Sequence, residues 1–380
     1  MIKPRLKKSH QVYKNSDGDL AIGEVGPSAY FIQNPPEHLE SLLIKLDGTR
    51  TMQRLRRDMH REHGVSYDDT DSAVKRLQEA KLLVDEAERS NLLSASEIER
   101  YDRQMLQFEA LETNGRPGFR YQEQLKRTRV CVLGMGGWGT WLSELLALIG
   151  VGKLRLVDAD YVENSNLNRQ LLYHDEHIGC QKVEAAADTL RRVNPFVEVE
   201  YLDQFVEIDQ QQIARTLDSM DLAVLCWANQ SAFVKETAEQ LIHDHCRTAG
   251  IDIIEVAGDP FDIGVGPIYT YSKTTFIDLH KVQVQERKEW WPEDNPQLTQ
   301  FRRESTHAKP IISGNAWQSA PSLAMIAGIA SNELIRYLSG VETTRTETGR
   351  LSINLTTYHI NWHDYETFII DENELDKKQD

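Results

Sequence analysis

Strand-like and helix-like spacings of apolar residues alternate along the middle of the chain, and this alternation predicts the main fold. Between residues 129 and 256, short apolar segments are separated by longer segments with the apolar spacing of helices. Because parallel strands need helical crossovers, the alternation predicts a doubly wound, mostly parallel α/β sheet. After Gly258, "DIGVGPIYTYSKTTFID" and "RLSINLTTYHINWHDYETFII" alternate as strands do, which predicts an antiparallel extension interrupted by a helix at 319–339. The expected parallel strands are 129–134, 154–158, 197–202, 221–226 and 251–256.

The first 90 residues follow a different pattern. "DLAIGEV" and "AYFIQN" are typical of short strands, and "PEHLESLLIKLDGTRTMQRLRRDMHREHG" of two amphipathic helices split at Asp47-Gly48. A third helix in "YDDTDSAVKRLQEAKLLVDE" and a short strand at 82–84 complete a small α+β, winged-helix-like domain. The predicted domains are, in order, 1–90, a charged helical connector at 91–128, and the α/β domain at 129–380.

Composition narrows the possible partners. The chain has 380 residues and a formal net charge of −16, from 43 Lys and Arg against 59 Asp and Glu. Nucleic acids and anionic lipids attract basic surfaces, so this balance disfavours both as partners. No stretch approaches the length of an apolar membrane span, and no signal peptide is recognised. The four cysteines lack a C-x-x-C pair, so we expect no disulfide, no structural zinc and a cytoplasmic location.

A glycine-rich turn at the start of the α/β domain predicts a nucleotide site. In "VCVLGMGGWGTWLSELLALIGVGKLRLVDAD" a strand, a turn, a helix and a second strand ending on Asp158 form a Rossmann-like βαβ unit. Gly134 permits the tight turn, Gly136 and Gly137 let the backbone approach a phosphate, and Gly139 allows the helix to pack closely. The helix N-terminus offers free N–H groups to an anion, and Asp158 is placed to bind ribose hydroxyls.

The stretch that follows, "VDADYVENSNLNRQLLYHDEHIGCQK", argues against a nicotinamide cofactor. Nicotinamide enzymes need an open face for the ring after the second strand, whereas this chain supplies Asn166, Arg169, Gln170 and Lys182 there. Two cations and two amides suit a triphosphate, whose charge must be neutralised during group transfer. A solvated charged loop is the alternative from composition alone.

At these residues the chain resembles a known family. "RYDRQM", "GMGGWGTWLSELLALIGVGKLRLVDADYVENSNLNRQLL" and "IGCQKVEAA" are similar to the ThiF/MoeB group of the ubiquitin-activating superfamily, whose members activate carboxylates with ATP. The resemblance implies that Asp158 holds the ribose and that Asn166, Arg169 and Lys182 bind the phosphates. It also implies a homodimer in which Arg103 reaches the neighbouring subunit's site as an arginine finger. Catalysis would then depend on Arg103, Arg169 and Lys182.

The chain departs from the family pattern at the magnesium site. The family carries a magnesium-binding aspartate after the fourth strand, but "LAVLCWANQSAF" has Ala228 at that position. The loss removes a hard oxygen ligand of the kind that Mg²⁺ prefers, so Asp160 or Asp259 would have to replace it. We therefore expect ATP with Mg²⁺ but assign no metal ligand. The alternative is a degenerate, non-catalytic protein that recruits a peptide for a separate synthetase.

The N-terminal domain carries a second resemblance. "LLIKLDGTRTMQRL" and "GVSYDDTDSAVKRLQEAKLLV" resemble the precursor-peptide recognition element of enzymes that modify ribosomally made peptides. In that family a leader peptide pairs with an exposed strand edge and packs on the third helix. A winged-helix shape also fits DNA binding, but the acidic start of the third helix at 68–71 would face phosphates unfavourably.

Together the two resemblances imply the microcin C and pantocin branch of the family. The missing cysteine pairs favour the pantocin type. That type implies activation of a side-chain carboxylate or carboxamide in a precursor peptide, followed by cyclisation, in antibiotic biosynthesis. The polar segment 283–317 is expected to be a long loop, either a lid or simply exposed, with Arg302, Arg303 and Lys309 available to an acidic peptide.

Overall fold

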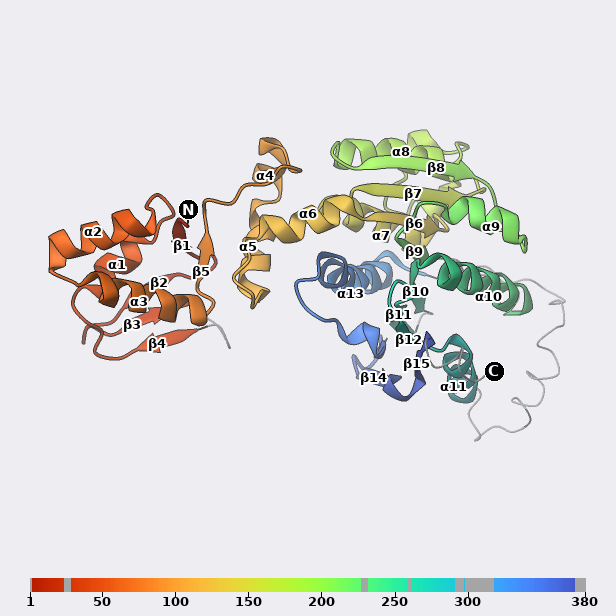
Figure 1. Cartoon of the computed structure of the whole chain (residues 1–380). Coiled ribbons are helices and arrows are strands. Elements are labelled where there is room, and N and C mark those ends of the chain that lie inside the picture. The colour runs from red at the N-terminus through yellow and green to blue at the C-terminus, as the bar shows by residue number, and fades with distance from the viewer. Residues whose placement is uncertain are drawn as a thin grey trace. The chain divides into compact units, whose positions relative to one another are not determined.

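The computed structural model of the chain describes residues 2–23, 29–226, 232–258, 261–290 and 318–372, together with Gln297. The chain forms two compact units, Met1–Lys126 with Ser339–Glu342 and Arg127–Leu338 with Thr343–Asp380 (Figure 1). Within the described ranges, no helix combines the length and the apolar character needed to cross a bilayer.

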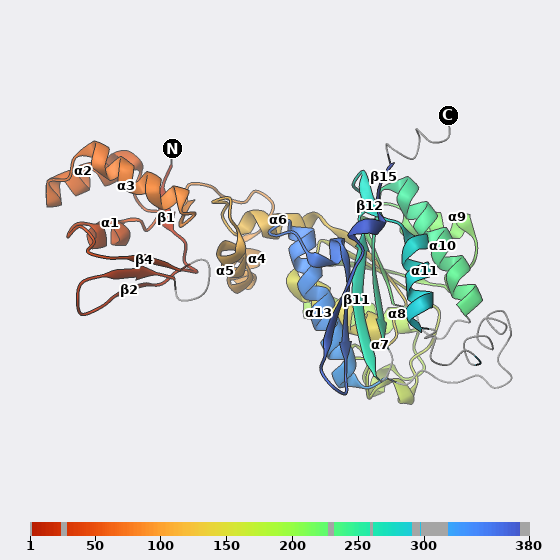
Figure 2. The same cartoon turned by 90° about the horizontal axis from the view of Figure 1, so that it is seen from below.

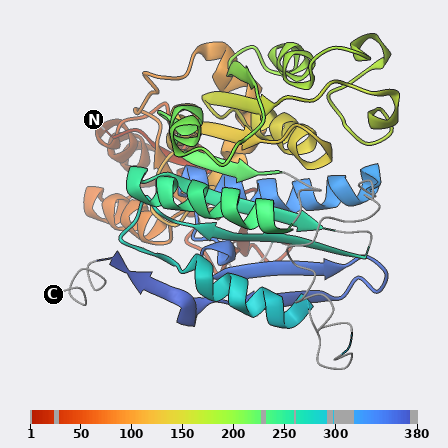
Figure 3. The ribbon, with the colours of Figure 1, turned by 90° about the vertical axis from the view of Figure 1, so that its right-hand side faces the viewer.

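An eight-stranded mixed sheet forms the centre of the second unit, in the order β14-β13-β11-β10-β9-β6-β7-β8. Strands β8, β7, β6, β9 and β10 run parallel, and β11, β13 and β14 extend the sheet in antiparallel fashion. Figure 3 shows this progression from yellow and green strands to blue ones. The predicted sheet is therefore confirmed. Its strands are β6 (Arg129–Leu133), β7 (Lys153–Asp158), β8 (Glu198–Asp203), β9 (Leu222–Leu225), β10 (Asp252–Gly258), β11 (Asp262–Tyr269), β13 (Gly349–Asn354) and β14 (Ile360–Asp364).

Helices cover both faces of this sheet. They are α7 (Gly137–Ile149), α8 (Lys182–Val193), α9 (Gln210–Leu217), α10 (Ala232–Ala249), α11 (Leu279–Trp290) and α13 (Ala320–Ser339). Successive side chains of a strand point to opposite faces. Val130 and Val132 of β6 thus share a core with α7, α8 and α13, whereas Cys131 and Leu133 share another with α9, α10 and α11. Figure 2 shows α13 and α10 on opposite sides of the sheet. Burial on both faces explains the continuous apolar runs of the inner strands β6 and β9, whereas the edge strand β8 keeps exposed polar residues.

Part of the predicted long loop is helical, and the prediction of a loop starting at residue 283 is wrong there. Helix α11 extends to Trp290. Leu279 and Val282 in its first turn are buried in the core. The sequence that follows is polar and lacks the apolar spacing by which a helix is predicted. Arg302, Arg303 and Lys309 lie outside the described residues. Beside the main sheet, β12 (Thr275–Ile277) pairs with β15 (Ile369–Asp371).

The first unit begins with a small α+β arrangement, as expected. A three-stranded antiparallel sheet, β2-β3-β4, and three helices share a core that includes Leu20, Ile22, Leu55 and Leu77. Helix α2 ends at Gly64, whose φ of +68° glycine adopts without strain. The elements are β1 (Pro4–Leu6), β2 (Val12–Lys14), β3 (Leu20–Ile22), β4 (Tyr30–Ile32), α1 (Leu39–Lys45), α2 (Met52–His63), α3 (Tyr67–Glu79) and β5 (Leu83–Asp85), with β1 paired to β5.

Three further helices complete the first unit: α4 (Ala95–Arg100), α5 (Asp102–Leu111) and α6 (Phe119–Arg127). Ion pairs with little exposed surface join the N-terminal strand to the end of α5. Lys7 Nζ lies 2.5 Å from Glu112 Oε1, with side chains 2% and 0% exposed, and Arg5 Nη2 lies 3.0 Å from Glu109 Oε1. The helices predicted as a connector are thus held to β1 within one compact unit. The division into domains 1–90, 91–128 and 129–380 stays a prediction.

Candidate nucleotide site

A cavity of about 890 Å³ opens in the second unit at the carboxyl ends of β6, β7 and β9. Strand β6 has β7 on one side and β9 on the other, so the chain order reverses here. In open α/β sheets, ligands bind at such a reversal point. The lining includes nine of the ten predicted nucleotide-binding residues: Gly134, Gly136, Gly137, Asp158, Asp160, Asn166, Arg169, Gln170 and Lys182.

The glycine-rich turn brings bare backbone to the cavity wall. Gly134 has a φ of +99°, and Gly136 has no heavy atom within 4 Å of the place a Cβ would occupy. Gly139 does not line the cavity. A Cβ at Gly139 would lie 1.9 Å from the carbonyl oxygen of Gly134, so the residue lets α7 start directly against the turn. The unpaired N–H groups of this helix start can bind a phosphate.

Asp158, at the end of β7, ties the turn to the next loop. Its Oδ2 accepts a hydrogen bond from the Met135 N–H (2.7 Å) and its Oδ1 accepts one from the Asp160 N–H (2.8 Å). The Tyr173 hydroxyl donates to the Met135 carbonyl (2.8 Å), and burial raises the pKa of Tyr173 well above its usual value, which keeps it a donor. Each carboxylate oxygen has a second lone pair, so Asp158 can still accept from a ribose hydroxyl.

Lys182 is the buried cation of the cavity. It is the first residue of α8, and its Nζ lies 2.7 Å from Asp160 Oδ2, with side chains 8% and 53% exposed. Its backbone N–H also donates to the Asp160 carbonyl (2.9 Å). These two bonds fix the lysine stem, so the ammonium is held in place before any ligand arrives. Phosphate oxygens could share it with Asp160.

The segment from 163 to 170 supplies the amides and a second cation. Asn166 Oδ1 accepts from the Glu163 N–H (3.0 Å), and Arg169 Nη1 donates to the Ser165 carbonyl. The Trp141 indole on α7 donates to the Arg169 carbonyl (3.0 Å), which connects this segment to the helix. These hydrogen bonds hold the segment in shape and against α7, so the Asn166 amide and the Arg169 guanidinium are kept in the cavity lining.

Gln170 has a side-chain oxygen that accepts no hydrogen bond within the described structure. The residue is 4% exposed, and its buried Oε1 has no hydrogen-bond partner there. A buried unsatisfied acceptor costs about 1–3 kcal/mol, which a donor group on a bound ligand would remove. With the bare turn at one wall and two cations at another, the cavity fits a nucleoside triphosphate. Ala228 and Asp259 lie outside the described residues, and the described carboxylates in the lining are Asp158, Asp160 and Glu163.

Sequence reasoning missed several lining residues. Gln204, Phe205 and Val206 follow the carboxyl end of β8, and Trp138 and Gln318 complete the wall. Phe205 is 62% exposed and offers an aromatic surface at the cavity edge. The rule that ligands bind beyond the carboxyl ends of parallel strands could have identified 204–206, since β8 itself was predicted.

Arg103, predicted as an arginine finger, belongs to the first unit. It lies in the first turn of α5, its side chain is 90% exposed, and its Nη1 lies 3.4 Å from Asp102 Oδ2. This exposure leaves the guanidinium accessible to a second copy of the chain. Its action in the neighbouring subunit stays a prediction.

Comparison with known proteins agrees with the resemblances inferred from the sequence, for the N-terminal part and for the α/β part of the chain. Residues 101–373 match the ThiF family, and residues 9–68 match the PaaA-like N-terminal domain. Molybdopterin-synthase adenylyltransferase of Haemophilus influenzae is 31% identical over 192 residues, which are 50% of this chain and 72% of that enzyme. SAMP-activating enzyme E1 of Haloferax volcanii is 33% identical over 165 residues, covering 43% of this chain and 56% of that enzyme.

Solved structures extend the similarity over nearly the whole chain. The crystal structure of PaaA is 32% identical, with a TM-score of 0.75, and the match covers 94% of this chain and 99% of that one. Escherichia coli MccB, solved with ATP, has a TM-score of 0.67 over 95% of this chain and 96% of its own. At 18% identity, that match shows the fold alone. The adenylyltransferases of this group are ATP-dependent enzymes. The predicted resemblance is confirmed, and the chain belongs to the ThiF family, with a PaaA-like N-terminal domain before the ThiF fold.

Proposed function

We propose that this protein is an ATP-dependent enzyme that activates a side-chain carboxylate or carboxamide of a ribosomally made precursor peptide. The activated group is an acyl adenylate or acyl phosphate. An internal nucleophile of the peptide then attacks the acyl carbon, displaces AMP or phosphate, and closes a ring. The observation that carries the proposal is a triphosphate-sized, cationic cavity in a chain that also has a PaaA-like N-terminal domain and matches PaaA along its length.

The cavity residues have separate tasks in this proposal. ATP supplies the activating group for the acyl carbon. The N–H groups at the start of α7 bind phosphate oxygens, and Lys182 and Arg169 neutralise the negative charge that develops during transfer. Asp158 orients the ribose, and Asn166 and Gln170 hold neighbouring polar groups. Asp160 is the described candidate for a Mg²⁺ ligand, because its carboxylate is half exposed beside Lys182.

The first unit offers an edge where a peptide can add as a strand. Among the described residues, strand β4 pairs with β3 on one side only, and its Tyr30 and Phe31 are 36% and 66% exposed. The Tyr30 hydroxyl donates to the Ala80 carbonyl at the end of α3 (2.7 Å), so β4 and α3 lie side by side. An extended leader peptide could form main-chain hydrogen bonds to β4 and rest apolar side chains on Phe31.

Mass spectrometry tests the reaction directly. Candidate precursor peptides are incubated with the protein, Mg²⁺ and ATP, and ring closure is expected to remove one water from the peptide while ATP is consumed. Omission of ATP is the control. An unchanged mass for every peptide encoded near the gene would contradict the proposal.

A non-catalytic recruiter is the second candidate, and Ala228 favours it because the family's magnesium ligand is missing. Such a protein binds a leader peptide and need not bind ATP. Calorimetry separates the two: saturable ATP binding with Mg²⁺ supports the enzyme, and no binding at millimolar ATP supports the recruiter.

A further inference from the structure

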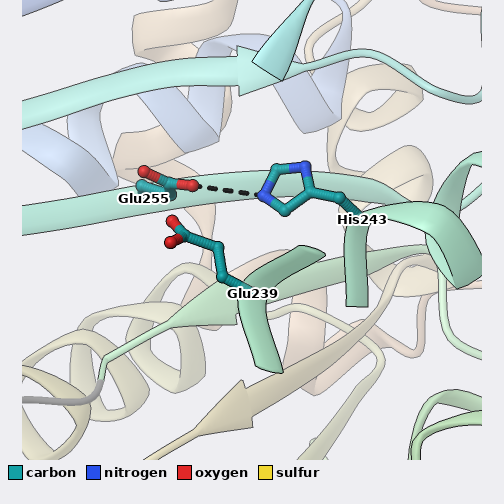
Figure 4. A group of neighbouring side chains, drawn as sticks. All are labelled: Glu239, His243 and Glu255. Atoms are coloured by element: carbon teal, nitrogen blue, oxygen red, sulfur yellow. Dashed lines mark hydrogen bonds and ion pairs between the residues drawn. The ribbon is translucent and has the colours of Figure 1, made fainter. Parts of the chain in front are cut away.

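Three potential metal ligands converge between α10 and β10 in the second unit (Figure 4). Glu239 and His243 are four residues apart on α10, so they lie on one face of the helix. Glu255 comes from β10, where its neighbours Ile254 and Val256 point into the opposite core. One ligand atom from each of the three residues lies within 4.8 Å of the others.

The three groups are held away from bulk water. His243 is 2% exposed, Glu239 is 8% exposed and the Glu255 side chain is 19% exposed. His243 Nε2 lies 3.2 Å from Glu255 Oε1, and Nδ1 lies 2.8 Å from the Tyr271 hydroxyl. The Tyr269 ring meets the imidazole edge-on at a centroid distance of 4.5 Å. The imidazole orientation is thereby fixed by contacts on both sides.

Glu255 already supplies one hydrogen-bonding carboxylate to His243, at 3.2 Å from Nε2. Glu239 adds a second carboxylate, and one ligand atom from each of the three residues lies within 4.8 Å of the others, a spacing that one bound cation could bridge.

We propose that Glu239, His243 and Glu255 form a binding site for one divalent metal ion, with Zn²⁺ as the first candidate. Imidazole nitrogen is a poor ligand for Mg²⁺ and Ca²⁺, whereas one nitrogen and two carboxylate oxygens suit Zn²⁺ and leave a position for water. None of the three residues lines the nucleotide cavity, so the two sites do not share residues.

Metal coordination would change the hydrogen bond that orients the histidine. With the ion on Nε2, the Nδ1–H donates to the Tyr271 hydroxyl oxygen, an outer-shell contact that fixes the ring. The ion would also join α10 to β10. The C-x-x-C criterion could not detect this site, because its ligands are a helix pair and a strand residue brought together only by the fold.

The test measures zinc content and stability. The full-length protein is stripped with a chelator, dialysed against Zn²⁺ or Mg²⁺, and examined by elemental analysis and thermal unfolding. We expect about one zinc per chain and a higher Tm with Zn²⁺ only. His243→Gln and Glu255→Gln, which preserve side-chain size closely, should lose the zinc while keeping the circular dichroism spectrum and ATP binding. His280→Gln, an exposed histidine on α11, is the matched control and should keep it.

Tyr271→Phe provides a second variant that keeps all three ligands. It should weaken zinc affinity roughly 10- to 100-fold, as loss of an outer-shell hydrogen bond typically does. Equal zinc content in the wild type and His243→Gln would overturn the proposal. So would loss of zinc in His280→Gln, which would indicate binding at surface histidines, and an equal stabilisation by Mg²⁺ would overturn the choice of metal.

Discussion

At the scale of single residues, the nucleotide cavity depends on a position that has no room for a side chain. Gly139→Ala would place a Cβ 1.9 Å from the Gly134 carbonyl oxygen, where only backbone could yield. We expect the free energy of unfolding to fall by about 1–3 kcal/mol and ATP binding to weaken, because the turn must shift. Chemical denaturation and calorimetry measure the two effects.

Gly328→Ala is the matched control for this prediction. Gly328 lies in α13 with no heavy atom within 4 Å of its added Cβ, so alanine should stabilise the helix by about 0.5–1 kcal/mol. If both variants change stability equally, the close approach of α7 to the turn does not constrain the fold.

Residues near motifs could be predicted from the sequence, whereas residues joined only by the fold could not. Asp158 and Lys182 follow from a strand end and a helix start, and both line the cavity. Glu239 and Glu255 meet because of the packing of α10 on β10, and no spacing in the sequence determines the distance between a helix and a strand.

At the scale of elements, strand β1 is anchored by a charge that has no access to water. Lys7→Met leaves Glu112 buried without its cation, and the free energy of unfolding should fall by about 3–5 kcal/mol. Adding Glu112→Gln should recover part of the loss, because no charge then remains uncompensated. Urea denaturation of the three proteins measures the difference.

Lys14→Met is the control, because Lys14 pairs with Glu40 on the surface, where the side chains are 54% and 50% exposed. A loss of no more than about 1 kcal/mol is expected there. A similar small loss for Lys7→Met would show that the buried pair contributes no more than a surface pair.

The edge of β4 is the second element that can be tested. Phe31→Glu places a charge on the predicted peptide-binding edge, and a labelled precursor peptide should bind about tenfold more weakly, since an apolar contact is lost. Ile44→Glu on α1 is the control, because Ile44 is 69% exposed but does not belong to β4. Fluorescence anisotropy measures both, and equal weakening in the two variants would argue against binding at β4.

Elements with a strong local pattern were predictable, and elements without one were not. The predicted bounds of the five parallel strands agree with the structure to within two residues. The inner strands β6 and β9 are buried on both faces, which gives them an uninterrupted apolar run. Strands β1 and β2 were missed because each has only three residues. Strand β1 also depends on a partner far along the chain, β5. Helix α11 was missed because its polar second half lacks a clear apolar stripe.

At the scale of the whole molecule, the order of the domains could be predicted but not the limits of the compact units. Ser339–Glu342 lies far along the chain from Met1–Lys126 yet belongs to the same unit. Such an assignment depends on contacts between distant segments, which a sequence pattern does not record. The predicted homodimer would likewise be a property of the whole molecule, and a functional test can address it.

The homodimer prediction can be tested by mixing two inactive variants. Arg103→Ala removes the guanidinium proposed to serve the opposite subunit, and Lys182→Ala removes a cation from the chain's own cavity, so each alone should lower ATP-dependent turnover by roughly 10²–10³-fold. In a mixed dimer, one site receives Lys182 from one chain and Arg103 from the other. Random exchange should therefore restore about a quarter of the sites, because half of the dimers are mixed and each has one complete site. Turnover is measured after subunit exchange has been verified with differently tagged chains. No recovery would show that Arg103 acts within its own subunit or not at all, and the functional argument for a dimer would then fail.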